Sequence, residues 1–115
     1  MKEATITLLG NEYKARFDIQ TMTNYERIAK QPFFNADYAK VSDRLALVVA
    51  AICSADPKAE VDSDSILKKG DLDTFKEIVA AFSPVLDLMN DFFEIPDVEP
   101  EEKKPEPGSE GKVKN

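Results

Sequence analysis

The sequence predicts an α+β fold, in which an N-terminal β-hairpin is followed by a bundle of about four helices and a disordered C-terminal tail. Three observations predict it. Apolar side chains alternate at the start of the chain, recur at helical spacing over its middle, and become sparse from Asp97 onward. A chain of 115 residues is long enough for one domain with its own core. We therefore expect a globular domain over residues 1–96 and a tail over 97–115.

The hairpin is predicted over residues 4–17, where apolar and polar side chains alternate in two short runs. Gly10-Asn11 separates the two runs, and both residues tolerate the positive φ angles that primed hairpin turns require. We therefore expect these two residues to form the loop. The alternating apolar positions are Ile6 and Leu8 on the first strand, then Tyr13, Ala15 and Phe17 on the second.

Helical spacing of apolar residues predicts the first two helices. Asp18 is a suitable N-cap for a helix over 19–30, which Pro32 ends. A second helix is expected over 37–55. Apolar side chains surround nearly its whole circumference, which is typical of a central, buried helix.

Two further helices are predicted after residue 60. A short helix fits residues 63–69, with Gly70 as its C-terminal glycine. Asp71 or Asp73 then caps a fourth helix, in which Pro84 should cause a kink or a split. The apolar face of this helix runs to about Glu94 through Leu72, Phe75, Val79, Phe82, Leu86, Met89 and Phe93.

The tail prediction depends on composition. Residues 97–115 are rich in proline, glutamate and lysine and contain no aromatic residue. Such a segment cannot bury enough apolar surface to offset the entropy lost on ordering. We therefore expect it to be disordered.

The residue types present exclude most catalytic and metal chemistry. The chain has no histidine, so the commonest general base and metal ligand are missing, and its single cysteine, Cys53, cannot build a zinc site. No Gly-rich phosphate loop or nucleophile elbow is present. The acid pairs at 62–64 and 71–73 are expected to be caps, with a weak cation site as the alternative, because a calcium loop from Asp62 would need glycine where Leu67 stands. We expect no catalytic residue, cofactor or metal, and hence no enzyme.

Charge and hydropathy indicate which partners and which cellular compartment to expect. It carries 22 acidic against 15 basic residues, a net charge of −7 with no basic stripe, which disfavours nucleic acid and anionic membranes as partners. The longest apolar run, Leu45–Cys53, is well short of the ~20 residues that span a bilayer. Cys53 is expected to be a small core residue, and a lone cysteine fits a reducing compartment. With no signal peptide in Met1–Gly10, we expect a cytoplasmic protein.

Aromatic residues beside predicted loops and element ends are the candidate partner-binding residues. They could close the core, or they could form an apolar patch that receives a partner helix. Phe92 and Phe93 favour the patch slightly, because successive residues of a helix point about 100° apart and cannot both lie at the centre of one narrow stripe. The candidates are Phe33, Phe34, Tyr38, Met89, Phe92 and Phe93.

The stretch Thr5–Asp18, TITLLGNEYKARFD, resembles the start of phage tail assembly chaperones, small proteins encoded by long-tailed phages and prophages. That family often opens with a strand, a Gly/Asn turn, a second strand of the form Tyr-Lys-x-x-Phe-Asp, and a short acidic helix. Here the second strand is Tyr13–Asp18, and the helix contains Met22 and residues 25–28. The later apolar and amphipathic helices also look similar, so the resemblance covers about residues 4–94.

The resemblance implies a non-catalytic role in tail assembly within the bacterial host cell. Such chaperones bind the long, helical, aggregation-prone tape measure protein before the tail tube polymerises around it. The implied partner is a tape measure protein or another tail protein, and a homo-oligomer is left open. The alternatives are a structural head–tail or tail component of a prophage, or an acidic binding module such as an inhibitor or antitoxin.

Overall fold

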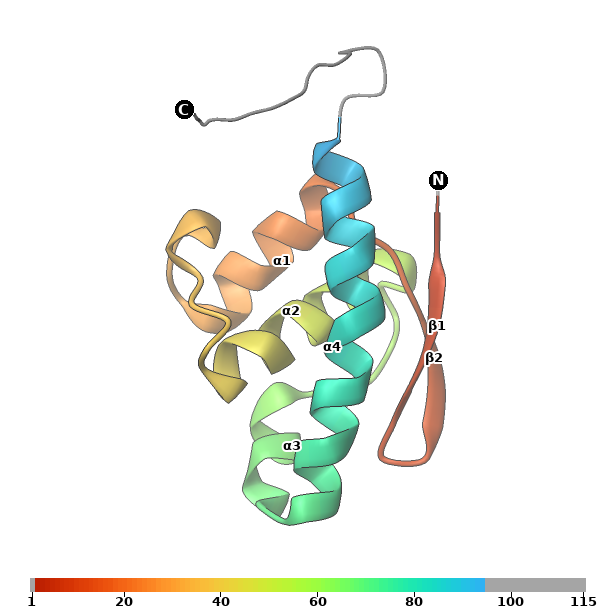
Figure 1. Cartoon of the computed structure of the whole chain (residues 1–115), viewed down its shortest axis with the longest axis vertical. Coiled ribbons are helices and arrows are strands. Elements are labelled where there is room, and N and C mark those ends of the chain that lie inside the picture. Colours follow the sequence, from red (N-terminus) through yellow and green to blue (C-terminus); the bar gives the residue numbers. More distant parts are fainter. Residues whose placement is uncertain (1, 95–115) are drawn as a thin grey trace, which may run out of the picture.

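The computed structural model of the chain describes residues 2–94 and confirms the α+β fold: a two-stranded antiparallel hairpin followed by four helices (Figure 1). The predicted tail, residues 97–115, lies outside the described residues. The elements are β1 (Ala4–Leu8), β2 (Asn11–Ala15), α1 (Ile19–Ala29), a short 3-10 helix η1 (Phe33–Asn35), α2 (Val41–Ala55), α3 (Ser63–Lys69) and α4 (Leu72–Phe93).

Helix α2 is the centre of the domain, as its apolar circumference predicts. Every residue from Leu45 to Ile52 is buried, and α2 packs against α1, α3, α4 and β2. It begins at Val41 and not at residue 37 as expected. The backbone N–H of Asp37 donates to the Asp43 carboxylate over 2.9 Å, and this contact holds residues 37–40 in a turn ahead of the helix.

The hairpin loop lies one residue earlier than predicted. Leu8 pairs with Asn11, so the two loop residues are Leu9 and Gly10, with φ angles of 54° and 81°. The expected Gly10-Asn11 loop is therefore wrong, although the positive φ angles are those of a primed turn. The Leu9 N–H donates to the Glu77 carboxylate of α4, so a tertiary contact fixes the turn register.

Helix α4 runs without interruption over 22 residues, and in Figure 1 it extends down the length of the molecule between the hairpin and the other helices. Of the two outcomes predicted at Pro84, a kink or a split, the split is wrong, because α4 is one helix on both sides of the proline. Phe82 and Val85 are buried on either side of the proline, and α4 packs against both α2 and β1. Tertiary packing therefore stabilises one helix across a residue that disfavours helix locally.

Two apolar rows run along α4. The core row, which is buried, consists of Thr74, Ile78, Ala81, Val85 and Leu88. The outer row is the set whose spacing predicted the helix, and Phe82 is its one buried member. The outer row consists of Leu72, Phe75, Val79, Phe82, Leu86, Met89 and Phe93.

Candidate partner-binding surface

One acid of each pair acts as a helix cap, as the sequence predicts, and the other lies in the first turn of the same helix. The Asp62 carboxylate accepts from the Ser65 N–H at the start of α3, and Asp71 accepts from the Thr74 N–H at 2.8 Å at the start of α4. Hydrogen bonds from the side chains of Ser65 and Thr74, and then from their N–H groups, hold the pKa of both carboxyls below their usual range. Among residues 2–94, no group of three or more acidic, cysteine or histidine side chains is placed to hold a metal ion.

Cys53 is half-buried on α2 and packs against the edge of the core. Burial raises the pKa of its thiol, although nearby Arg27 opposes the shift. The thiol is therefore protonated at neutral pH, and a protonated thiol is a poor nucleophile. None of the helices between residues 2 and 94 combines the length and apolar character needed to cross a membrane.

Five phenylalanines from three separate segments meet at the C-terminal end of α4, and we call this cluster the aromatic end. Phe17 follows the hairpin, Phe33 and Phe34 belong to η1, and Phe92 and Phe93 close α4. The ring centroids of Phe17 and Phe92 are 5.2 Å apart, and those of Phe34 and Phe93 are 6.5 Å apart. Centroid separations in this range, with tilted rings, are favourable aromatic contacts.

The aromatic end has a buried base and an exposed outer layer. Phe17 and Phe33 are 3% and 5% exposed and belong to the core. Phe34 is 78% exposed, Phe93 46% and Phe92 39%. Of the predicted candidates, the structure thus brings four phenylalanines together, with Phe33 on the core side and the other three facing outward.

Tyr38 and Met89, the other two candidates, lie outside this ring cluster. The Tyr38 ring packs on Phe82 at 5.2 Å, in the middle of α4. Burial raises the pKa of its hydroxyl, which has no hydrogen-bond partner within the described part of the chain. The Arg44 guanidinium also lies over the Phe82 ring, 5.4 Å from its centroid. Met89 is partly buried against the core.

Polar contacts that sequence reasoning missed hold η1 in place below the aromatic end. The Phe33 N–H donates to the Glu26 carboxylate at 2.9 Å. The Gln31 amide donates to the Tyr25 hydroxyl at 2.7 Å and to the buried Asp43 carboxylate at 3.3 Å. These contacts tie the residues on both sides of Pro32 to α1 and α2, so Phe34 projects from an anchored segment.

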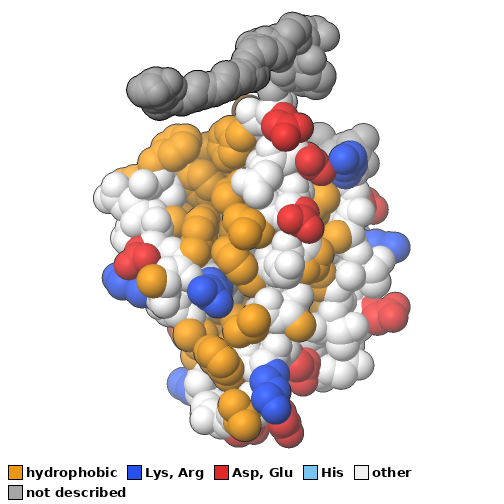
Figure 2. Space-filling model, viewed as in Figure 1, with side chains coloured by type: hydrophobic (Ala, Val, Ile, Leu, Met, Phe, Trp, Pro, Cys, Tyr) orange, Lys and Arg blue, Asp and Glu red, His pale blue; other side chains and the backbone are white. Residues whose placement is uncertain are grey.

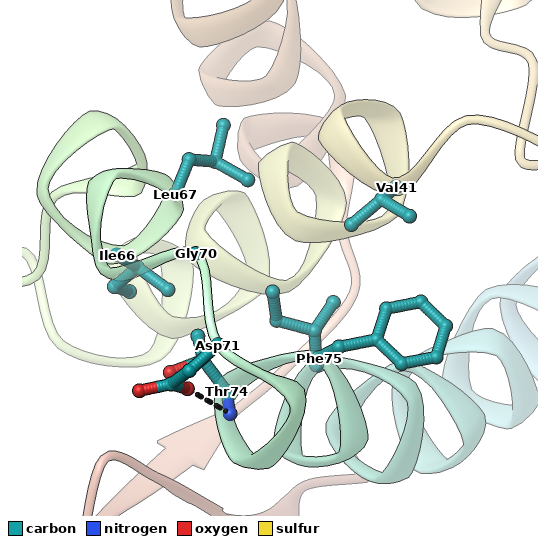
Figure 3. Close-up of a pocket in the computed structure, with 8 residues that line it drawn as sticks. Val41, Ile66, Leu67, Gly70, Asp71, Thr74 and Phe75 are labelled. Carbon is teal, nitrogen blue, oxygen red and sulfur yellow. Dashed lines mark hydrogen bonds between the residues drawn. The ribbon is translucent and has the colours of Figure 1, made fainter.

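A second apolar region, which the sequence did not single out, lies at the other end of α4. We call it the α3–α4 groove. Leu67 of α3, Val41 of α2 and Phe75 of α4 lie around a cavity of about 210 Å³ (Figure 3). Leu67, Leu72, Phe75 and Val79 are between 37% and 63% exposed, so this region also faces outward. The signal that could have found it is the outer row itself, whose first three members lie here.

The two regions belong to one face of the molecule. Figure 2 shows hydrophobic side chains in a band that follows α4 from its C-terminal end, at the top, toward the α3 end, at the bottom. Acidic side chains flank the upper part of this band on one side. A long apolar band with polar margins is typical of a surface that binds another protein.

Comparison of the chain with known protein families, curated proteins and solved structures finds no match. The resemblance of residues 4–94 to tail assembly chaperones therefore stays a prediction. The structure adds the arrangement of the apolar surface along α4.

Proposed function

We propose that this chain is a tail assembly chaperone, a non-catalytic protein that covers apolar helical segments of a phage tape measure protein before the tail is built. The observation that carries the proposal is the aromatic end, where Phe34, Phe92 and Phe93 are exposed on a buried base of further rings. The resemblance at Thr5–Asp18 supplies the identity of the partner.

The exposed rings are suited to act as binding anchors. Phe92 lies 5.2 Å from the buried Phe17, and Phe34 lies 5.2 Å from the buried Phe33. Rings held by packing lose little side-chain entropy when a partner covers them. Aromatic anchors of this kind commonly dominate the energy of protein interfaces.

The charge around the aromatic end favours a partner with basic residues beside its apolar face. Asp87, Asp91 and Glu94 are exposed on the last turns of α4, and one of them, Asp91, pairs with Lys2 at 2.8 Å. Acidic side chains beside an apolar surface speed the association of a basic partner and disfavour the binding of an acidic one. The net charge of −7 also helps to keep a chaperone–client complex dispersed.

The test is binding to the protein encoded by the very long, helix-rich reading frame that should follow a chaperone gene. Phe34→Ser and Phe93→Ser should each weaken co-purification at least tenfold, because each removes an exposed anchor worth about 1.4 kcal/mol or more. Both should keep the melting temperature within a few degrees, whereas Phe33→Ser should lower stability by about 3–5 kcal/mol because its ring is buried.

Leu72→Ser is the matched control, because it removes an exposed apolar side chain from the opposite end of α4. It should weaken client binding less than the two phenylalanine variants do. Unchanged binding by both variants, or their unfolding, would show that the aromatic end is not the client site. Recovery of the protein in finished tails would instead favour the structural tail component.

A further inference from the structure

We propose that two copies of this chain pair side by side and antiparallel through the outer row of α4, so that the aromatic end of each copy covers the α3–α4 groove of the other. The proposal does not rest on the chaperone function. It rests on the spacing of the outer row, on the shapes of its two ends, and on the charges beside them.

The spacing of the outer row is that of a helix-pairing seam. Its seven positions follow one another at alternating intervals of three and four residues, from Leu72 to Phe93, over the whole length of α4. This repeat keeps a stripe facing a second helix. The core row buries α4 against α2 and β1, and the middle of the outer row also packs in the fold of one copy, so the exposed positions of the outer row are at its two ends: Leu72, Phe75, Val79 and Phe93.

The two ends of the band differ in shape and complement each other. The aromatic end projects, with Phe34 78% and Phe93 46% exposed. The α3–α4 groove is hollow, with a cavity of about 210 Å³ beside Leu67 and Phe75. A protein cavity of about 150 Å³ is large enough to hold benzene, so this one can accept a phenyl ring. Parallel pairing would set projection against projection and leave both grooves open.

Antiparallel pairing also keeps the seam in register. When Phe93 lies opposite Phe75 of the second copy, Met89 falls opposite Val79 of that copy. The contact between Phe93 of one copy and Phe75 of the other then occurs twice, once at each end of the seam. The contact is a closed, two-fold one, which limits the assembly to a dimer.

The charges favour the same orientation. Exposed lysines lie at the groove end among the acids Asp62, Asp64, Asp71, Asp73 and Glu77, while the last turns of α4 carry exposed acids and no lysine or arginine. A parallel pair would bring the acidic ends together, whereas an antiparallel pair places them beside lysines. The helix dipoles of the two α4 helices also favour the antiparallel pair. The lysines are Lys68, Lys69 and Lys76, and the acids are Asp87, Asp91 and Glu94.

The remainder of the chain is a poor alternative occupant of the band. Its aliphatic side chains in residues 95–115 are Ile95, Val98 and Val113, among prolines, glutamates and lysines. Such a composition has too little apolar surface to cover a seam of seven positions. A second copy supplies that surface with matching length and spacing.

The first test measures the mass of the purified full chain by light scattering and sedimentation over a wide concentration range. We expect a species of twice the 12.8 kDa of one chain. Val79→Glu and Leu72→Glu should each raise the dimer dissociation constant at least tenfold, and the exposure of both positions allows the fold to survive. Thr7→Glu, on the exposed face of the hairpin, should leave the dimer unchanged.

The second test fixes the orientation by disulfide formation in a Cys53→Ala background. Phe75→Cys and Phe93→Cys chains should cross-link with each other in a mixture, because these two positions face each other in the antiparallel pair, and each alone should cross-link slowly. Rapid cross-linking of Phe75→Cys with itself would overturn the antiparallel arrangement, and a monomeric wild-type chain would overturn the dimer. A monomer that still binds client would leave the chaperone proposal standing, and a dimer that binds none would overturn that proposal alone.

Discussion

Asp18 connects three segments of the fold through one carboxylate. It accepts from the Thr21 N–H at 3.1 Å as the N-cap of α1, accepts from the Ser54 hydroxyl of α2, and pairs with Arg16 at 3.3 Å. Burial raises the pKa of this carboxyl, but the hydrogen bonds from Ser54 and Thr21 and the charge of Arg16 more than offset it, so the net pKa lies below its usual value.

Asp18→Ala should lower the free energy of unfolding by about 1–2 kcal/mol at neutral pH, because it removes a cap and its inter-helix contact. A carboxyl with a lowered folded pKa stabilises the fold above its unfolded pKa, near 3.8, and loses that effect as the pH falls through the folded pKa. The gap between wild type and variant, measured by urea unfolding, should therefore narrow below about pH 3.8. A gap that widened in acid would contradict this role for Asp18.

Leu9 shows where residue preferences stop predicting local structure. A β-hairpin was predictable from alternation alone, but Gly10-Asn11 suits a primed loop better than Leu9-Gly10 does. The structure places Leu9 at a φ of 54°, a region that disfavours leucine. Its side chain packs against the core and its N–H meets Glu77, a residue 68 positions away in the sequence. A contact between residues so far apart in the sequence cannot be predicted from the residue preferences around the turn.

At the scale of the element, α4 combines a strong helical pattern with a residue that disfavours helix. Pro84 has no N–H to donate to the carbonyl of Ala80, and its ring crowds the preceding turn. The helix persists because the core row buries its apolar side chains on both sides of the proline. The local cost of Pro84 is therefore still present in the folded protein.

Pro84→Ala should raise the free energy of unfolding by about 1–3 kcal/mol, because it restores a backbone hydrogen bond and a residue of high helix propensity. Thermal and urea unfolding measure the change. Ser83→Ala, at the exposed neighbouring position, is the control and should change stability by less than ~0.5 kcal/mol. A destabilised Pro84→Ala variant would mean that the proline ring packs in a way that alanine cannot replace.

The candidate site was predictable in part, for a reason that α4 makes clear. The spacing of Leu72, Phe75 and Val79 predicted a helix but could not say which apolar row the fold would bury. Both rows repeat at helical intervals, and the choice between them depends on where α2 and β1 lie. The adjacent phenylalanines did identify one end of the outward face, because two successive apolar residues cannot share one stripe.

At the scale of the whole molecule, the apolar band serves both proposals. A client helix and a second copy would use the aromatic end, so the two associations would compete. Acidic side chains beside that end favour a basic partner over a second acidic end. Competition of this kind would keep the apolar face covered until a client is made, which is the property an assembly chaperone needs.

The sequence sets the predicted domain boundary at residue 96, and the described structure allows that boundary to be tested. The hydrophobic core, the outer row and the α3–α4 groove all lie within residues 2–94. A chain ending at Pro96 should therefore have a free energy of unfolding within ~0.5 kcal/mol of that of the full chain. It should also still form a dimer and still bind the client. Urea unfolding, light scattering and co-purification of the shortened and full chains check this. Loss of client binding with unchanged stability would assign part of the binding surface to residues 97–115, because the fold itself would then be intact.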